Sequence, residues 1–578
     1  MKKLFFLVLL VSVCVQAQIP VFDWAITLGD YQSGATSIAV DNVGNVYTTG
    51  IFKDTGDFDS SSNTFNLTAN GANDFYVTKY DSSGNFIWAK NFGAIITPNT
   101  FDNDDQNIKL TLDTQGNLIF TGTFLGFGDF DPSAATAIIS TSSFSGNYVQ
   151  GNFILKLDSD ANFIWVKKIT AYLNCTGDSI FVDNDNEIYL TGNYVYTADL
   201  NPGAENYTVI SDGSSNIYIV KLASNGDFIW GKSLGNSSGE EDNKTIKVDI
   251  NKNVYLTGSF RNTLDLDPGL SVFNVISNGE KDAFFIKLNS TGDFQWGKSI
   301  GGQDNDSAVD ISIDNSGNFF AIGVFAFDVD FDPGLSVFNI DAGTILTNYL
   351  LKLDTNGNFN WALKLGNSVK TPNVANDLQG NIYFSSGFSS LLGPIDADPG
   401  PNVFNLSTLP DSDIYFAKLD TNANFIWAFN YGDGQFRETS DLLIKNDKIY
   451  YCGSFDQAGS QNLLDLNPFA GENGFDSITA SYVVKLAQPE ILNVEILSSK
   501  NRIHVYPNPT STNLNLQSSV NLDNASLKII SLPGQTVFEK QNLSGLDFSF
   551  DVSKLSSGLY IIEITQKSHK ETLKFIKD

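Results

Sequence analysis

The chain of 578 residues is too long for one ordinary core, so at least two domains, or one repeat array with an appendage, are expected. Hydrophobic residues make up 42% and charged residues 17% of the sequence, which is the balance of a folded protein and excludes general disorder. The formal net charge of −30 repels polyanions, so nucleic acid is excluded as an expected partner.

The N-terminus has the pattern of a Sec signal peptide, predicted as residues 1–17. Two lysines precede an apolar run over residues 4–15, and the small Ala17 supplies a cleavage site. Cys14 leaves a lipoprotein signal as the alternative, although the residue before it is bulkier than that signal requires. No later stretch has the roughly 18 uninterrupted apolar residues that span a bilayer, so no transmembrane segment is expected.

Residues 18–487 are predicted to be a repeat array, because all seven tryptophans recur in one frame, Phe-x-Trp. Successive tryptophans lie 64, 77, 65, 66, 65 and 66 residues apart. Positions i and i+2 of a strand share a face, so each Phe and Trp of the frame are expected to point together into the core. The tryptophans interpreted as structural core residues are Trp24, Trp88, Trp165, Trp230, Trp296, Trp361 and Trp427.

Each repeat unit contains two hairpin patterns, such as residues 307–325 with the turn DNSGN and residues 349–366 with the turn DTNGN. Two hairpins make a four-stranded sheet, and a ring of such sheets is a β-propeller. The array starts with a lone Trp strand at 21–28, and its seventh unit ends at 481–487 without one. The sequence therefore predicts an all-β fold, a seven-bladed β-propeller of four-stranded blades with velcro closure by the N-terminal strand.

Three stretches of the array resemble the secreted bacterial β-propeller repeat family: AVDNVGNVYTTG at 39–50, DAFFIKLNSTGDFQWGKSIGG at 282–302 and AVDISIDNSGNFFAIG at 308–323. The resemblance covers roughly residues 20–487. It implies a propeller fold and export to the cell surface. Because that family has no common ligand or reaction, the resemblance implies no particular activity.

Every unit carries an acidic string between its second and third strands, of which 265–268 and 330–333 are examples. Alternating carboxylates could supply oxygens to calcium, and the candidate ligands are Asp265, Asp267, Asp330 and Asp332. An Asp-Pro-Gly triplet also forms a turn by itself, with the carboxylate on a backbone N–H and the intervening Phe or Leu plugging the blade. A calcium loop needs about five or six protein oxygens, so the turn is favoured, and no cofactor is expected, with calcium as the alternative.

The connections between strands fall into two classes by length. Tight turns join the first strand to the second and the third to the fourth, whereas the other connections are long and irregular. In an antiparallel blade these classes emerge on opposite faces, and variable loops on a rigid scaffold are where binding usually occurs. The candidate ligand-binding residues of this predicted variable face are Asp102, Asp104, Asp105, Glu240, Glu241, Asp242, Asp304, Asp306, Arg437 and Glu438.

A linker is predicted at 488–500, after which the repeat is gone. Four motifs resemble the C-terminal sorting domain of the type IX secretion system of Bacteroidetes: VYPNPTSTNLNL at 505–516, LKIISLPGQTVFEK at 527–540, SGLYIIEI at 557–564 and KETLKFIK at 570–577. The resemblance implies a small β-sandwich at 501–578, the type IX machinery as partner, passage across the outer membrane, and release or surface attachment. A generic β-sandwich binding module is the alternative.

The array contains no histidine, which excludes a Ser–His–Asp triad, a Cys–His pair and histidine-ligated zinc there. Sialidases resemble the predicted fold but need three arginines, and between the signal and residue 500 only Arg261 and Arg437 occur. The sequence thus favours a noncatalytic, monomeric protein, secreted or attached to the cell surface, that binds an extracellular glycan or protein. The alternative is a carbohydrate-active enzyme, a glycosidase or lyase, that uses unique carboxylates of the variable face.

Overall fold

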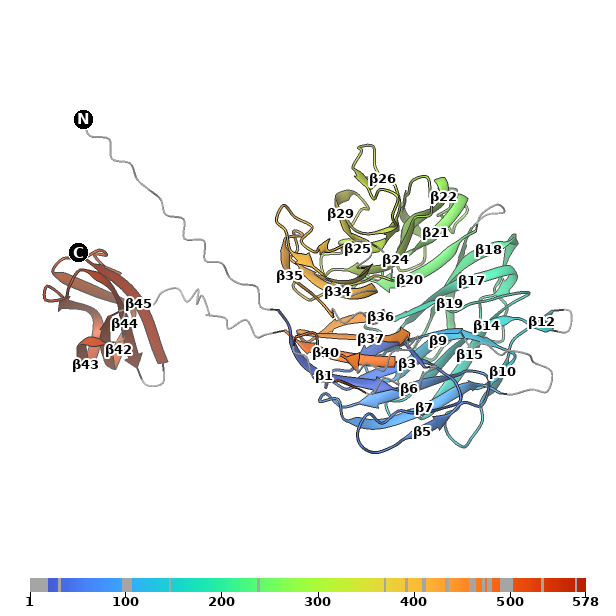
Figure 1. Ribbon diagram of the computed structural model, residues 1–578, viewed down its shortest axis with the longest axis horizontal. Helices are drawn as coiled ribbons and strands as arrows, with labels where there is room; N and C mark the ends of the chain where they lie inside the picture. Colours follow the sequence, from blue (N-terminus) through green and yellow to red (C-terminus); the bar gives the residue numbers. More distant parts are fainter. Residues whose placement is uncertain are drawn as a thin grey trace. The chain divides into compact units, whose positions relative to one another are not determined.

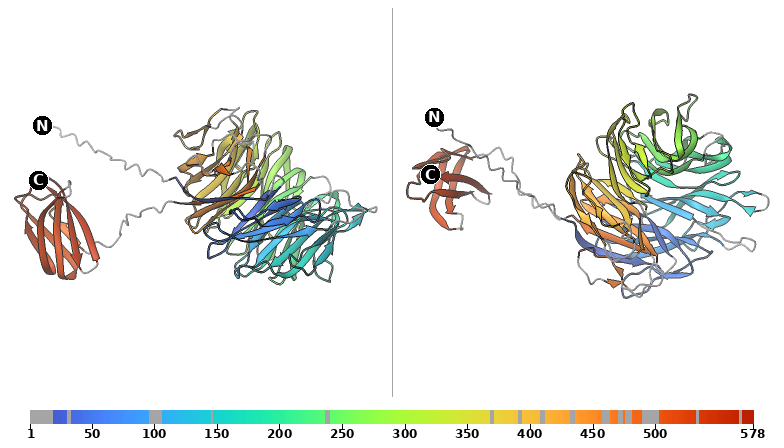
Figure 2. Two further views of the ribbon diagram at one scale, coloured as in Figure 1. Left: turned by 60° about the horizontal axis from the view of Figure 1, so that its bottom comes forward. Right: turned by 45° about the horizontal axis from the view of Figure 1, so that its top comes forward.

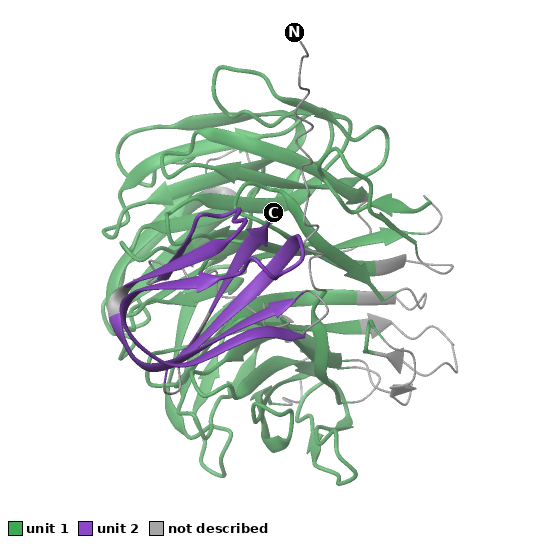
Figure 3. Cartoon of the chain, turned by 90° about the vertical axis from the view of Figure 1, so that its left-hand side faces the viewer, with its two compact units in different colours: residues 1–489 green, residues 490–578 purple. Residues whose placement is uncertain are grey.

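The computed structural model describes residues 19–29, 33–95, 106–144, 147–235, 240–367, 371–389, 393–407, 412–431, 436–456, 464–469, 474–475, 481–488, 503–531, 535–566 and 569–578. The predicted signal peptide lies outside these residues, as does the predicted linker except for Gln488. Contacts divide the chain into two compact units, residues 1–489 (unit 1) and 490–578 (unit 2), coloured in Figure 3. The described residues form strands, turns and irregular segments without a helix, which confirms the all-β prediction, and they hold no helix suited to crossing a membrane.

Unit 1 consists of successive sets of four antiparallel strands in which each strand pairs with the next. The sets, from first to fourth strand, are β2 (Gly34–Val40), β3 (Val46–Phe52), β6 (Asp74–Tyr80) and β7 (Phe86–Ala94); β8 (Gln106–Leu112), β9 (Leu118–Leu125), β14 (Gln150–Leu157) and β15 (Phe163–Ala171); β16 (Ser179–Val182), β17 (Ile188–Asp199), β18 (Thr208–Leu222) and β19 (Phe228–Leu234); β20 (Asp242–Val248), β21 (Val254–Asp265), β22 (Asn274–Leu288) and β23 (Phe294–Ile300); β24 (Ser307–Ile313), β25 (Phe319–Phe325), β28 (Thr347–Leu353) and β29 (Phe359–Asn367); β30 (Asn373–Asn376), β31 (Ile382–Ser389), β34 (Ser412–Leu419) and β35 (Phe425–Asn430); and β36 (Phe436–Lys445), β37 (Lys448–Asp456), β40 (Ser481–Ala487) and β1 (Val21–Leu28).

Short hairpins extend many of the connections between second and third strands. They are β4 (Thr55–Asp57) with β5 (Asn66–Thr68), β10 (Phe127–Asp129) with β11 (Ile138–Ser140), β12 (Ser143–Phe144) with β13 (Asn147–Tyr148), β26 (Asp328–Asp330) with β27 (Asn339–Asp341), β32 (Ile395–Asp396) with β33 (Asn405–Leu406), and β38 (Leu464–Asp465) with β39 (Gly474–Phe475). The opposite ends of the strands are joined by tight turns. In one of these, Oδ1 of Asp314 accepts the N–H groups of Ser316 and Asn318, and Gly317 takes the left-handed φ of 79° that the turn requires.

The last set contains both ends of unit 1. Strand β1 runs antiparallel to β40 from the pair Val21–Ala487 to the pair Leu28–Ser481, and Figure 1 shows the two side by side. This is the pairing predicted from the lone N-terminal Trp strand. The first strands of the sets contact one another in a closed order, β2, β8, β16, β20, β24, β30, β36 and again β2. The right-hand view of Figure 2 shows the sheets of unit 1 following one another in sequence order, from blue to orange.

The Phe-x-Trp frame contains a β-bulge in every set. Between β22 and β23, Lys287 lies opposite Trp296 and Leu288 opposite Phe294, which leaves Gln295 as the extra residue. Phe294 therefore packs with the preceding set and Trp296 with the following one, in different apolar clusters. The expectation that the two side chains share a face is wrong, because the inserted residue breaks the alternation of the strand.

Unit 2 has five described strands in one hydrogen-bonded sheet. They are β41 (Ile503–Tyr506), β42 (Asn513–Ser531), β43 (Thr536–Asp551), β44 (Gly558–Gln566) and β45 (His569–Lys577), ordered β41-β42-β44-β45 with β43 also paired to β42. Leu514, Ile529, Ile562 and Phe575 belong to its buried apolar cluster. The β-sandwich stays a prediction, since the five strands form one hydrogen-bonded sheet, in which β42 pairs with β41, β43 and β44, and β44 pairs with β45.

Candidate functional site

The acidic strings close turns with their carboxylates. Oδ1 of Asp330 accepts the N–H groups of Asp332 at 3.0 Å and Phe338 at 2.8 Å, and Oδ1 of Asp332 accepts the N–H of Gly334 at 2.8 Å. Phe331 between them is fully buried. The two contacts of Asp330 recur at Asp57, Asp129, Asp199, Asp265 and Asp396. These contacts support the turn interpretation, and the described residues hold no group of three or more acids, cysteines or histidines arranged for a metal ion.

In six of the seven described sets, a lysine near the end of the third strand donates to a residue of the next set. Lys352 donates from Nζ to the carbonyl of Thr421 at 3.1 Å, and its ammonium lies 5.1 Å from the ring centre of Phe320. The closing set uses the same contact, because Lys485 and the indole of Trp24 both donate to the carbonyl of Ser82, at 2.7 and 3.1 Å. Sequence reasoning missed these lysines, although a Lys-Leu or Lys-Tyr pair ends every third strand.

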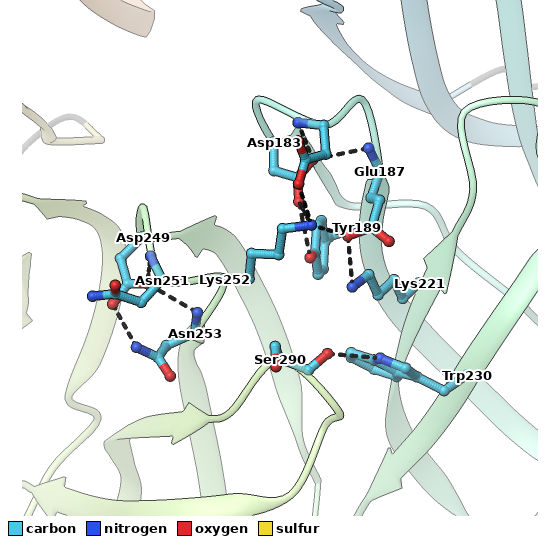
Figure 4. A network of polar contacts seen from close by, with 11 residues as sticks. Asp183, Glu187, Tyr189, Lys221, Trp230, Asp249, Asn251, Lys252, Asn253 and Ser290 are labelled. Atoms are coloured by element: carbon cyan, nitrogen blue, oxygen red, sulfur yellow. Dashed lines mark hydrogen bonds and ion pairs between the residues drawn. The ribbon is translucent and has the colours of Figure 1, made fainter.

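The joint between the third and fourth sets contains an additional ion-pair network (Figure 4). Lys252 lies in a tight turn of the fourth set, 2.8 Å from the carboxylate of Glu187 and 2.6 Å from that of Asp185. Lys221 approaches Glu187 at 2.8 Å as well. Burial alone raises the pKa of Glu187, but the hydrogen bonds from Lys221 and Lys252 outweigh it and lower this pKa to about 2. The network fixes the fourth set against the third, as the third-strand lysines fix other neighbouring sets, so we interpret it as structural.

The candidate residues of the variable face are scattered. Glu240 is exposed, with its carboxylate 3.9 Å from Nζ of Lys281, and the backbone carbonyl of the same Lys281 accepts the N–H of Asp306. Asp306 is 1% exposed, and its carboxylate accepts the N–H groups of Gly302 at 2.6 Å and Ala326 at 3.1 Å. Burial raises the pKa of Asp306 to about 7. Glu240 and Asp306 thus contact opposite ends of Lys281, and Asp306 is buried in a loop.

The remaining candidates have different surroundings. Glu241 is buried, whereas Asp304 is half-buried and accepts the N–H of Asn305. Glu438 is an exposed residue of β36, and Arg437 is described there only by its backbone. The acids that fall outside the described residues are Asp102, Asp104 and Asp105. Of the described candidates, Asp242 alone lines the cavity where the first strands meet.

That cavity has a volume of about 510 Å³ and is lined by β2, β8, β16, β20, β24, β30 and β36 together with the residues that precede them. Each first strand contributes one polar side chain at an equivalent position in its pairing with the second strand. We call this set the polar ring; its members are Ser37, Lys109, Ser179, Thr245, Asp310, Asn373 and Asp441. Sequence reasoning missed the ring, whose signal is a polar residue followed by Ile, Leu or Val at a fixed distance before each first turn.

Members of the polar ring bind the first strand of the adjacent set. Asp441 accepts the hydroxyl of Ser37 at 2.9 Å and the N–H of Ile38 at 3.0 Å. Asp310 accepts the N–H of Val374 at 3.0 Å, and the amide of Asn373 donates to the carbonyl of Thr439 at 2.9 Å. Hydrogen bonds between adjacent first strands thus hold the middle of the cavity wall. The charged side chains of the polar ring, Lys109, Asp310 and Asp441, already take part in such bonds.

The cavity wall has as many lysines as aspartates, although the protein as a whole is strongly acidic. Its charged lining residues are Lys109, Lys244, Lys247, Lys445, Asp178, Asp242, Asp310 and Asp441. Burial raises the pKa of Asp310, while the charge of Lys247 opposes that shift. At the end of the cavity toward the long connections, burial together with the charge of Asp242 raises the pKa of Asp178 to about 6. Two carboxylates therefore meet at this end, which we call the mouth.

Comparison with known proteins identifies the C-terminal unit. A family model described as a secretion system C-terminal sorting domain matches residues 504–578. Residues 504–578 are a type IX sorting domain. The sorting domain indicates export out of the cell through the type IX machinery, as its motifs predicted.

The repeat array has a curated relative. Over 465 residues the chain is 23% identical to an uncharacterized WD repeat-containing protein of Acanthamoeba polyphaga mimivirus. The match covers 68% of this chain and 32% of that protein, so the chain spans about a third of the length of the curated relative it matches. WD repeats build β-propellers, so the match supports a β-propeller repeat protein.

Among the solved structures that the chain matches are two larger neighbours. They are the extracellular domain of a hybrid two-component system protein from B. thetaiotaomicron and the endosialidase of phage phi92. Each is 10% identical, and they cover 94% and 96% of this chain, corresponding to 86% and 87% of their own. The TM-scores are 0.19 and 0.29, too low to carry an argument about fold or function.

Proposed function

We propose that the exported chain is a noncatalytic binding protein whose unit 1 is a seven-bladed β-propeller and whose unit 2 is a small sorting sandwich. The four-stranded sets and the closed order of their first strands support the blades. Binding takes place on the variable face, where the long connections surround the mouth of the cavity. The ligand is an extracellular glycan or protein, and the mature protein acts outside the cell or on its surface.

The polar ring is the observation that carries this proposal. The turn-capping aspartates and third-strand lysines keep nearly the same chemistry from set to set, as expected of groups that hold the fold. In the polar ring the side chain changes from hydroxyl to amide to carboxylate to ammonium, although the backbone position is equivalent. A ligand needs such an asymmetric lining, with a few polar groups in a concave site.

The test is capture of a ligand by the mature chain on arrays of glycans and peptides. The variant Asp242→Asn/Lys244→Gln removes the ion pair at the mouth, whose atoms are 2.8 Å apart. We expect it to weaken capture by about tenfold or more, since each 1.4 kcal/mol is a factor of ten. The matched control is Asp328→Asn in the exposed start of β26, which leaves capture unchanged. Equal capture by all three proteins would place the binding site elsewhere.

A carbohydrate-active enzyme is the second candidate, and the mouth is the observation that favours it. Burial raises the pKa of Asp178 to about 6, and Asp242 lies beside it. Glycoside hydrolysis uses a pair of carboxyl groups, of which the acid has a raised pKa. If a captured glycan is cleaved, product analysis reveals it. Loss of cleavage with retained binding in Asp178→Asn would establish this role.

A further inference from the structure

The mouth of the cavity contains polar groups that the fold leaves unused. Asn243 is 2% exposed and lines the cavity, and the oxygen of its side-chain amide has no hydrogen-bond partner among the described residues. A buried amide oxygen without a partner loses the hydrogen bonds that it makes with water in the unfolded chain, so it calls for an explanation. A ligand that donates a hydrogen bond to this amide is one such explanation.

Two acids flank this amide. The N–H of Ile246 donates to the hydroxyl of Ser179 at 3.2 Å, which fixes β16 against β20. Asp178 directly precedes Ser179, and the side-chain N–H of Asn243 stabilises its carboxylate by a hydrogen bond. The hydroxyl of Thr176 donates to Oδ2 of Asp178 at 3.0 Å. The mouth therefore gathers a carboxylate, an amide oxygen and, one residue away on β20, the carboxylate of Asp242.

We propose that the mouth binds a ligand through a primary ammonium group, held by Asp178 and the amide oxygen of Asn243 with Asp242 beside them. The inference rests on the proposed binding function. An ammonium has three donors and one positive charge, which match two or three oxygen acceptors of net negative charge. A peptide amino terminus and an amino sugar both supply this group.

A calcium ion fits this site less well. Calcium takes six to eight oxygens, whereas the mouth offers one carboxylate, one amide oxygen and an Asp242 already paired with Lys244. Burial of Asp178 next to Asp242 also penalises its charged form, and a bound ammonium relieves that penalty without rearrangement of the wall.

The experiment compares matched pairs of probes by isothermal titration calorimetry on the mature chain. The pairs are trialanine with N-acetyl-trialanine and the glucosamine trimer with the N-acetylglucosamine trimer. We expect at least one free amine to bind, and its acetylated partner to bind about tenfold or more weakly. The peptide and sugar arms identify the source of the ammonium group.

Variants assign the binding to the mouth. Asp178→Asn and Asn243→Leu should each weaken amine binding by about tenfold or more, while Asp328→Asn leaves it unchanged. Thermal melting checks that each variant is folded. Equal binding of free and acetylated probes, no saturable amine binding, or calcium binding that depends on Asp178 would each overturn the proposal. An array ligand that depends on Asp242 and Lys244 but tolerates acetylation would overturn the ammonium inference and leave the proposed function intact.

Discussion

Aspartates in unit 1 serve the backbone at most of the repeated positions. At the tight turns, Oδ1 of Asp354 accepts two N–H groups, those of Asn356 and Asn358, and in the acidic strings Asp330 does the same for Asp332 and Phe338. Each repeat needs these residues, so their number grows with the number of repeats. The charge of −30 thus follows in large part from turn chemistry.

The contribution of the third-strand lysines to stability can be tested by substitution. Lys352→Met keeps an unbranched apolar side chain but removes the ammonium, and with it the bond to the carbonyl of Thr421 and the contact with the ring of Phe320. We expect the free energy of unfolding to fall by about 1.5–3 kcal/mol, the range for a hydrogen bond from a charged group. Urea unfolding measures it, and Lys53→Met, at an exposed position, is the control. Equal stability of the two variants would mean that the lysine contact contributes nothing.

Asp306 predicts a pH dependence of stability. Its pKa is raised from 3.8 to about 7 by burial, so the folded state binds more protons than the unfolded state between those values. The stability that Asp306 confers is therefore present at low pH and lost as the pH rises toward 7. We expect the unfolding free energy of the wild type, relative to Asp306→Asn, to decrease between pH 4 and pH 7. A constant difference in denaturant unfolding across this range contradicts the prediction.

At the scale of elements, the fourth strand is the one whose packing departs from simple alternation. Its bulge sends Phe359 and Trp361 into different clusters, so a single strand contributes to the cores on both sides of its sheet. The acidic strings act at the same scale, because they close the second-to-third connection over a buried plug such as Phe331. Regular repeats thus depend on one irregular position in each fourth strand.

The acidic strings predict little response to a chelator. A site that binds only the folded form at 100 times its dissociation constant adds about 2.7 kcal/mol, so several occupied calcium sites would raise the melting temperature clearly. If the strings are turns, EDTA shifts the melting temperature by less than about 1 °C. Asp330→Ala, which removes two backbone contacts, lowers it in the same assay and serves as the positive control. A large decrease with EDTA favours calcium.

For the whole molecule, closure of unit 1 depends on its first strand. Strand β1 completes the set of β36, β37 and β40, and Trp24 donates to the carbonyl of Ser82 in the first set. Deleting residues 18–28 leaves the edge of β40 unpaired, so we expect aggregation, measured by light scattering after size-exclusion chromatography. An excess of a peptide of residues 18–28 should restore a monodisperse protein. A monodisperse deletion variant with an unchanged melting temperature would refute this closure.

The two compact units predict separable roles. A chain that ends at residue 490 retains unit 1 and lacks the sorting domain at 504–578. We expect it to fold, with the melting temperature of unit 1 in the full chain, but to remain inside the outer membrane. Cell fractionation and immunoblotting locate it. Release of the truncated chain to the medium would show that export does not need the tail.

The sequence by itself determined the strand pattern, the pairing of residues 21–28 with 481–487, and the sorting domain. These depend on local alternation, turn residues and contiguous motifs, which one stretch of chain expresses completely. The direction of Trp296 depended on a one-residue bulge that the period alone does not reveal. The contacts between successive first strands, which run in a closed order, became visible only in the structure.

Tertiary structure alone decided the cavity and its mouth. Asp178 and Asn243 are 65 residues apart in the sequence and meet because β16 and β20 belong to adjacent sets. The sequence singled out Asp242 by its charge and its place in a long connection, but it gave no reason to select Asn243, whose buried amide oxygen lacks a partner among the described residues. Burial and the missing partner are properties of the packed molecule, since they depend on groups that distant parts of the chain bring together.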